Sequence, residues 1–227
     1  MAEPTRLSAA AGIAAVVLHA IGTAGLSSIE AAYHPDKIER WAYAVADQEF
    51  AVVLSGGATF ASMMALLVWG VGLVRLLGPY AWPGGVLLFT AALTGAAGSL
   101  VPWVVSHFVP LGEEAIAHTL LGVALTLSGL FHVILALALF LLSIATGRDV
   151  RFPMVCFVLG LVSSFLVWPL LALAWSPVAA DFVVLGDIIW LSWVLVMSVQ
   201  MPRVPADLAG AQAEERAARR AGPAREH

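Results

Sequence analysis

Six stretches of the chain are long enough and apolar enough to cross a membrane as helices. A spanning helix needs roughly 20 mostly apolar residues, because the hydrocarbon core of a bilayer is about 30 Å thick. Each stretch has that length and contains at most two Asp, Glu, Lys or Arg residues. The predicted spans are 7–28, 48–74, 84–108, 115–145, 152–175 and 180–200. The pattern predicts an all-α, polytopic integral membrane bundle of about six transmembrane helices.

Composition supports this fold class and excludes several others. Hydrophobic residues make up 61% of the 227 residues and charged residues only 11%, whereas soluble domains carry about 25% charged residues. A soluble globule of this size could not remove so much apolar surface from water. One cysteine excludes a disulfide scaffold, and a net charge of −4 excludes an electrostatic nucleic-acid binder. We therefore expect the lipid bilayer, and no nucleic acid, as a partner, and leave the oligomeric state open.

The distribution of Lys and Arg predicts the orientation, because cytoplasmic segments collect these residues. With the N-terminus inside, nine of the 11 basic residues fall on the inner side. These are Arg6, Arg75, Arg148, Arg151, Arg203, Arg216, Arg219, Arg220 and Arg225, against Lys37 and Arg40 outside. We therefore predict a multi-pass protein of the plasma membrane with both termini in the cytoplasm.

The domain boundaries follow from the same pattern. Residues 1–201 are predicted to form the bundle, and residues 202–227, rich in Ala, Arg and Glu, a disordered cytoplasmic tail. The first apolar run is longer than a secretory signal requires, so we expect it to remain as a helix. Whether segment 29–47 forms a helix on the membrane surface stays open.

Two carboxylates are the candidate catalytic residues. An ionisable residue within a spanning segment is costly and usually faces a cavity or a partner. Asp187 lies in the last span, on the order of 10 Å below the outer surface; a structural acid bonded to a Ser, Thr or His of a facing helix is the alternative. Glu49 shares a helical face with Val45 and Val52, which predicts that it points inward; a carboxylate that snorkels at the surface is the alternative.

Four histidines lie in or beside the predicted spans. His118 and His132 are fourteen residues apart on the fourth span, a spacing that resembles b-type cytochromes, so haem b bound by His118 and/or His132 is one alternative. His19 or His107 could supply a second axial ligand to His118, but no partner is evident for His132. His19 and His118 are otherwise predicted to contact a substrate or to join helices. No recognised metal-ligand spacing is present, so no metal is predicted.

The tryptophans separate into two groups. Trp69 and Trp82 are predicted to belong to an inner interfacial belt. Trp103, Trp168 and Trp190 are predicted to line a substrate site, with core packing as the alternative.

Together these residues predict a cavity in the outer half of the bundle. A buried acid can protonate an apolar substrate, and aromatic faces stabilise the resulting cation. This chemistry predicts an enzyme that cyclises or isomerises an isoprenoid or a similar hydrophobic small molecule. Apart from the haem alternative, no cofactor is predicted.

Two short patches resemble small polytopic membrane-bound terpene cyclases: Gln48-Glu49-Phe50 and Gly186-Asp187-Ile188-Ile189-Trp190. In that family a Glu near an early helix and an Asp in the last helix serve to protonate an epoxide or alkene. The resemblance implies the same roles for Glu49 and Asp187. The family usually has seven spans and an aromatic residue directly before its Glu, whereas this chain has six predicted spans and Gln48.

The alternative from another class is a non-catalytic membrane subunit or small transporter whose polar residues only join helices. The two hypotheses differ in whether Glu49 and Asp187 converge on one cavity.

Overall fold

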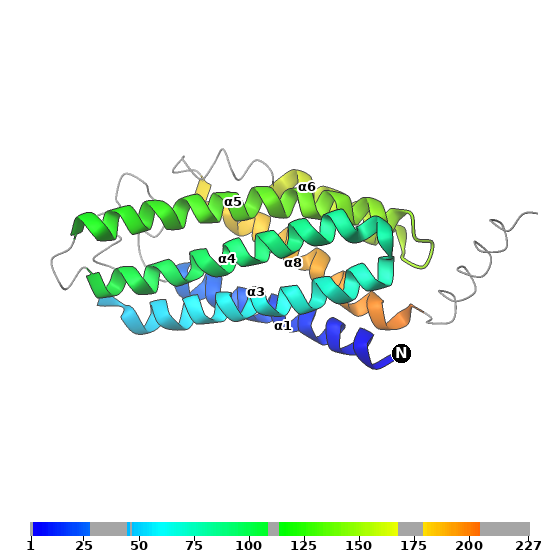
Figure 1. Cartoon of the computed structure of the whole chain (residues 1–227), viewed down its shortest axis with the longest axis horizontal. Coiled ribbons are helices and arrows are strands. Elements are labelled where there is room, and N and C mark those ends of the chain that lie inside the picture. The colour runs from blue at the N-terminus through cyan, green and yellow to red at the C-terminus, as the bar shows by residue number, and fades with distance from the viewer. Residues whose placement is uncertain (1, 28–44, 46, 109–113, 168–178, 205–227) are drawn as a thin grey trace, which may run out of the picture.

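The computed structural model describes residues 2–27, 45, 47–108, 114–167 and 179–204 (Figure 1). Within these ranges the chain is helical apart from short turns, and it contains no strand. The helices are α1 (Ala2–Ser27), α3 (Glu49–Leu77), α4 (Trp82–Phe108), α5 (Glu114–Gly147), α6 (Met154–Val167) and α8 (Ala179–Gln200), with the short 3-10 turns η2 (Pro79–Ala81) and η4 (Met201–Arg203). The predicted all-α fold is confirmed for this part of the chain.

Five predicted spans coincide with one helix each, and the predicted span 152–175 contains α6. Among the described residues, five helices are long and apolar enough to cross a membrane: α1, α3, α4, α5 and α8. The described part of α6 has 14 residues and is shorter than a span. The rest of predicted span 152–175, from residue 168, lies outside the described residues, as do residues 29–44 of the open segment and the tail from residue 205.

The helices form a closed ring. Each packs against its neighbour in the chain, from α1 to α3, α4, α5, α6 and α8, and α8 packs back against α1. Figure 1 shows them lying side by side along the long axis of the molecule. The ring brings α1, α5 and α8, which are far apart in sequence, around one interior.

The start of α1 and the end of α8 lie at the same end of the bundle (Figure 1). A Cβ added to Gly12 would lie 2.0 Å from Ser198 Oγ, and η4 packs against α1. This arrangement agrees with an even number of spans. The cytoplasmic location of both termini stays a prediction.

Two tryptophans fill the centre of the ring. Trp69 and Trp193 are fully buried and meet edge to face, with ring centroids 5.6 Å apart. Trp193 Nε1 also donates a hydrogen bond of 2.9 Å to the Cys156 carbonyl. The predicted place of Trp69 in an interfacial belt is therefore wrong, because its face of α3 points into the ring. Trp82 is 63% exposed, as an interfacial residue would be.

A buried arginine joins the turn after α5 to the end of α3. Arg151 donates hydrogen bonds to both carboxylate oxygens of Asp149 and, from Nη2, to the Leu76 carbonyl at 2.7 Å. The hydrogen bond with Asp149 raises the pKa of the Arg151 guanidinium above its usual range. These contacts hold α5, α6 and α3 together at this end of the bundle.

Candidate functional site

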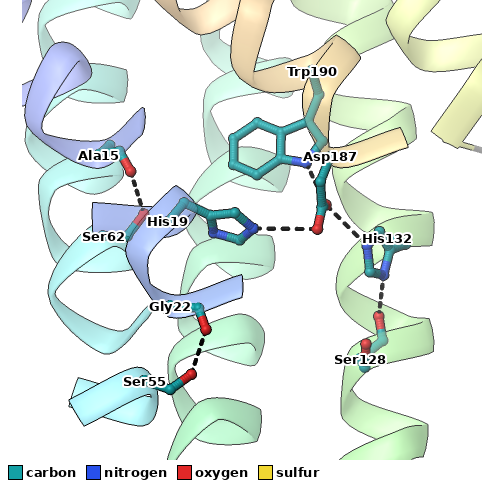
Figure 2. A network of polar contacts seen from close by, with 9 residues as sticks. All are labelled: Ala15, His19, Gly22, Ser55, Ser62, Ser128, His132, Asp187 and Trp190. Atoms are coloured by element: carbon teal, nitrogen blue, oxygen red, sulfur yellow. Dashed lines mark hydrogen bonds and ion pairs between the residues drawn. The ribbon is translucent and has the colours of Figure 1, made fainter. Parts of the chain in front are cut away.

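Asp187 lies at the centre of a polar cluster inside the ring (Figure 2). It comes from α8 and is 7% exposed. Trp190, one turn later on the same helix, donates a hydrogen bond of 2.8 Å from Nε1 to Asp187 Oδ1. His19 Nε2 of α1 lies 3.4 Å from Oδ2, and His132 Nε2 of α5 lies 3.5 Å from Oδ1. Three helices of the ring therefore meet at one carboxylate. We call His19, His132, Asp187 and Trp190 the central cluster.

The orientation of the His132 ring turns Nε2 toward Asp187, at an ion-pair distance of 3.5 Å and without a hydrogen bond. His132 Nδ1 lies 2.7 Å from the Ser128 carbonyl oxygen, which can only accept a hydrogen bond, so Nδ1 carries a hydrogen. If Nε2 were bare, its lone pair would face a carboxylate, and the two would repel each other unless Asp187 were protonated. Either His132 is an imidazolium or Asp187 is a neutral acid. The pair holds one proton in both cases.

His19 contacts the other oxygen of the same carboxylate. Its ring is 6% exposed and packs edge to face on Trp190 with centroids 5.1 Å apart. Nδ1 of His19 has no hydrogen-bond partner among the described residues, so a neutral ring with its hydrogen on Nε2 donates toward Asp187. His19 is thus the second proton-bearing group of the central cluster.

Serines of α3 position α1 on either side of His19 (Figure 2). Ser62 donates a hydrogen bond of 2.7 Å to the Ala15 carbonyl, and Ser55 donates one to the Gly22 carbonyl. Gly22 allows α1 to approach closely, because a Cβ there would lie 2.1 Å from Thr59 Oγ1. Small and hydroxyl-bearing residues at this interface fix the position of His19.

Aromatic rings enclose the cluster on the α5 side. Phe131 packs edge to face on His132 at 5.0 Å and on Trp190 at 6.2 Å between centroids. Phe131 is 4% exposed and Trp190 fully buried. Trp190 was predicted from the sequence but Phe131 was not, since its only signal was its place next to His132.

A partner for His132 was missed because the depth of His132 in the bundle was misjudged from the sequence. His19 lies about eight residues before the end of α1, and Asp187 lies about eight residues after the start of α8. Because each residue adds the same rise along a helix, the two side chains lie at the same depth in the bundle. His132 lies about eighteen residues after the start of α5. The 34-residue α5 extends further at this end than a span requires, so His132 is at the level of Asp187 and not near the opposite surface.

Glu49 belongs to a different cluster. At the start of α3 its Oε1 lies 3.8 Å from His107 Nε2 near the end of α4, and both side chains are more than half exposed. Trp103 packs edge to face on His107 at 5.5 Å, and the Trp103 carbonyl lies 3.1 Å from His107 Nδ1. The predicted inward direction of Glu49 is wrong, since α3 begins at this residue and its side chain faces outward. The structure does not bring Glu49 into contact with Asp187, so the predicted convergence of the two carboxylates is not found, and an acid-catalysed reaction would have to use Asp187 without Glu49.

Two further predicted residues cannot be placed beside either cluster. His118 lies within α5, but its side chain is outside the described part of the structure, and Trp168 is outside the described residues altogether. Of the predicted site residues, the structure therefore joins His19, Asp187 and Trp190, and separates Glu49 and Trp103 from them.

The geometry of the central cluster suits proton exchange. The two histidines contact different oxygens of the carboxylate, and within the described residues no group of three His, Cys, Asp or Glu has a geometry that could hold a metal ion. An axial haem bond to His132 Nε2 would require the Asp187 carboxylate to move away from that nitrogen. As placed, the two histidine nitrogens lie 3.4 and 3.5 Å from the carboxylate oxygens, within the distance of an ion pair.

Comparisons of the chain with protein-family models, curated proteins and solved structures give no match. A functional conclusion therefore rests on the central cluster.

Proposed function

We propose that this chain is a multi-pass membrane protein that carries out a proton-transfer step at Asp187, with His132 and His19 as its proton partners. The observation that supports this proposal is the His132 ring, whose Nδ1 hydrogen bond leaves Nε2 facing the carboxylate. A buried acid–base pair that holds one proton is the arrangement that general acid catalysis needs.

The proposed substrate is an apolar lipid, such as an isoprenoid that is cyclised or isomerised after protonation. The O–H bond of Asp187 breaks as a C–H bond forms on an alkene carbon, which leaves a carbocation and a carboxylate. The hydrogen bond from Trp190 stabilises that carboxylate, and the faces of Trp190 and Phe131 stabilise the cation. A neighbouring C–H then loses its proton to the cluster, which restores the acid without a further reagent.

A proton-coupled transporter is the second candidate. The observation that favours it is that His19, His132 and Asp187 come from three different helices of the ring. Moving a proton on or off the cluster changes the attraction between α1, α5 and α8, and such a change can drive a conformational step. In this case proteoliposomes that contain the protein would move protons only when its solute is present on one side.

The enzymatic proposal is tested by comparing lipid extracts of cells that produce the native chain, Asp187→Asn or Asp47→Asn. The Asp187 variant keeps the shape of the side chain but removes the acid. Asp47 is an exposed carboxylate, so its variant is the matched control. We expect cells with the native chain and cells with Asp47→Asn to contain a lipid product that cells with Asp187→Asn lack. The comparison is made at equal amounts of folded protein.

Identical lipid profiles in all three strains would contradict an enzymatic role. Proton movement in proteoliposomes, lost in Asp187→Asn, would then assign the cluster to transport.

A further inference from the structure

A groove runs along the surface between α3 and α4, away from the central cluster. Its volume is about 340 Å³. Four of its large apolar side chains are 49–63% exposed: Val71, Trp82, Val86 and Phe89. The remaining lining residues are Leu67, Gly70, Val74, Arg75, Gly85 and Leu88. The groove therefore opens sideways, toward the hydrocarbon if the bundle spans a membrane.

Close packing of the two helices sets the floor of the groove. A Cβ added to Gly85 would lie 2.4 Å from Val74 Cγ2, and one added to Gly70 would lie 2.8 Å from Leu88 Cδ2. The turn of residues 78–81 joins the helices directly at one end. The groove is thus held by a short, tightly packed helical hairpin.

One end of the groove is cationic. Arg75, in the last turn of α3, lines it and is exposed. Arg75 forms no hydrogen bond or ion pair with another described residue. Arg148, which follows α5, packs on the 78–81 turn, with its guanidinium 5.6 Å from the centre of the Tyr80 ring. An apolar trough that ends at an unpaired arginine and an exposed tryptophan matches an amphiphile with an anionic head.

We propose that this groove binds one anionic phospholipid, with an acyl chain between α3 and α4 and the phosphate on Arg75. From Leu67 to Arg75 the helix rises about 12 Å, which accommodates the first part of an acyl chain. The charge of Arg75 selects the anionic head, because a guanidinium binds a phosphate group through paired N–H donors. The site uses only the α3–α4 hairpin and is independent of the proton-transfer proposal.

The test uses the full-length protein in phosphatidylcholine vesicles that contain a small fraction of phosphatidylglycerol with brominated acyl chains. Bromine quenches nearby tryptophan fluorescence, and the difference between the native chain and Trp82→Phe isolates the signal of Trp82. We expect stronger quenching at Trp82 by brominated phosphatidylglycerol than by the same fraction of brominated phosphatidylcholine. Arg75→Gln is expected to reduce this preference roughly fivefold.

Arg203→Gln is the matched control, because Arg203 is exposed on η4 and does not line the groove. It is expected to keep the preference. Val71→Phe fills the groove without removing Arg75 and is expected to abolish it. Inorganic phosphate at millimolar concentration is expected not to compete, since it has no acyl chain.

Four results would overturn the proposal. An unchanged preference in Arg75→Gln would show that Arg75 does not bind the phosphate. An unchanged preference in Val71→Phe would show that the acyl chain does not lie in the groove. Competition by free phosphate would identify a general anion site. Quenching of Trp82 by neither lipid would mean that something else, such as a second copy of the chain, covers the groove.

Discussion

The position of a single proton decides the character of the central cluster. With Nδ1 of His132 bonded to Ser128, the charge state of Asp187 is linked to that of His132 Nε2, and His19 contacts the other carboxylate oxygen. Removing one partner of a buried charged pair leaves the other without compensation, so these residues act together. Trp190, which carries no charge, donates a hydrogen bond to the same carboxylate.

We predict that Trp190→Phe destabilises the protein more than Trp193→Phe does, by about 1 kcal/mol. Both tryptophans are fully buried on α8, but Trp190 donates to a carboxylate and Trp193 to the Cys156 carbonyl. When the proton of the pair is on His132, Asp187 is charged, and hydrogen bonds to charged acceptors are roughly twice as strong as those to neutral ones. Unfolding in mixed micelles, followed by circular dichroism, measures both variants; an equal or larger loss for Trp193→Phe would contradict the role given to Trp190.

Sequence reasoning found part of this cluster. An acid within a span is rare enough that Asp187 was identified at once, and helical spacing placed Trp190 beside it. The direction of the Glu49 side chain was misjudged because it depends on the residue at which α3 begins. A shift of two residues in that start turns the side chain from the interior to the surface. Trp69 was misjudged because residue type alone does not distinguish an interfacial tryptophan from one that faces the interior of a ring.

At the scale of helices, close contacts at glycines determine how the elements pack. Gly56 and Gly57 are neighbours on α3 but face different surroundings. A Cβ at Gly56 would lie 2.7 Å from the Ser99 carbonyl oxygen of α4, whereas a Cβ at Gly57 would have nothing within 4 Å. The close contact is with backbone, so relief requires α3 and α4 to separate.

We predict that Gly56→Ala destabilises the protein by about 1–3 kcal/mol. Gly57→Ala is the control and is expected to be neutral or slightly stabilising, because alanine restricts the unfolded chain. Thermal unfolding in the same detergent measures both. Equal stability of the two variants would show that α3 and α4 are not packed as closely as described.

The helices themselves were the most predictable feature. Their apolar runs have the length of a span, and charged or Pro-containing segments separate them, so the predicted bounds agree with the observed helices to within a few residues where these are described. The length of α5 was predicted, but how far it is shifted along its neighbours was not predictable from hydropathy, and this accounts for the missed contact between His132 and Asp187.

At the scale of the whole molecule, the ring closes through contact between α1 and α8. Hydropathy cannot predict this closure, because it depends on which faces of distant helices meet. We predict that Gly12→Cys with Ser198→Cys, in a Cys156→Ala background, forms a disulfide under mild oxidation. A Cβ at position 12 lies 2.0 Å from Ser198 Oγ. A mobility shift on a non-reducing gel measures the bond.

The control pairs Gly12→Cys with Ser192→Cys, which lies on the same helix about 9 Å further along its axis. No bond is expected there. Equal cross-linking in both pairs, or none in the first, would contradict the closed ring.

The central claim is that Asp187 shares protons with His132 and His19, and the most direct measurement is solid-state NMR of the chain with ¹⁵N-labelled histidine in lipid bilayers. Single His→Gln variants assign the signals. We predict a protonated Nδ1 for His132, and changed Nε2 signals for both His132 and His19 in Asp187→Asn but not in Asp47→Asn. His132 and His19 signals that are the same in the native chain and in Asp187→Asn would contradict the claim.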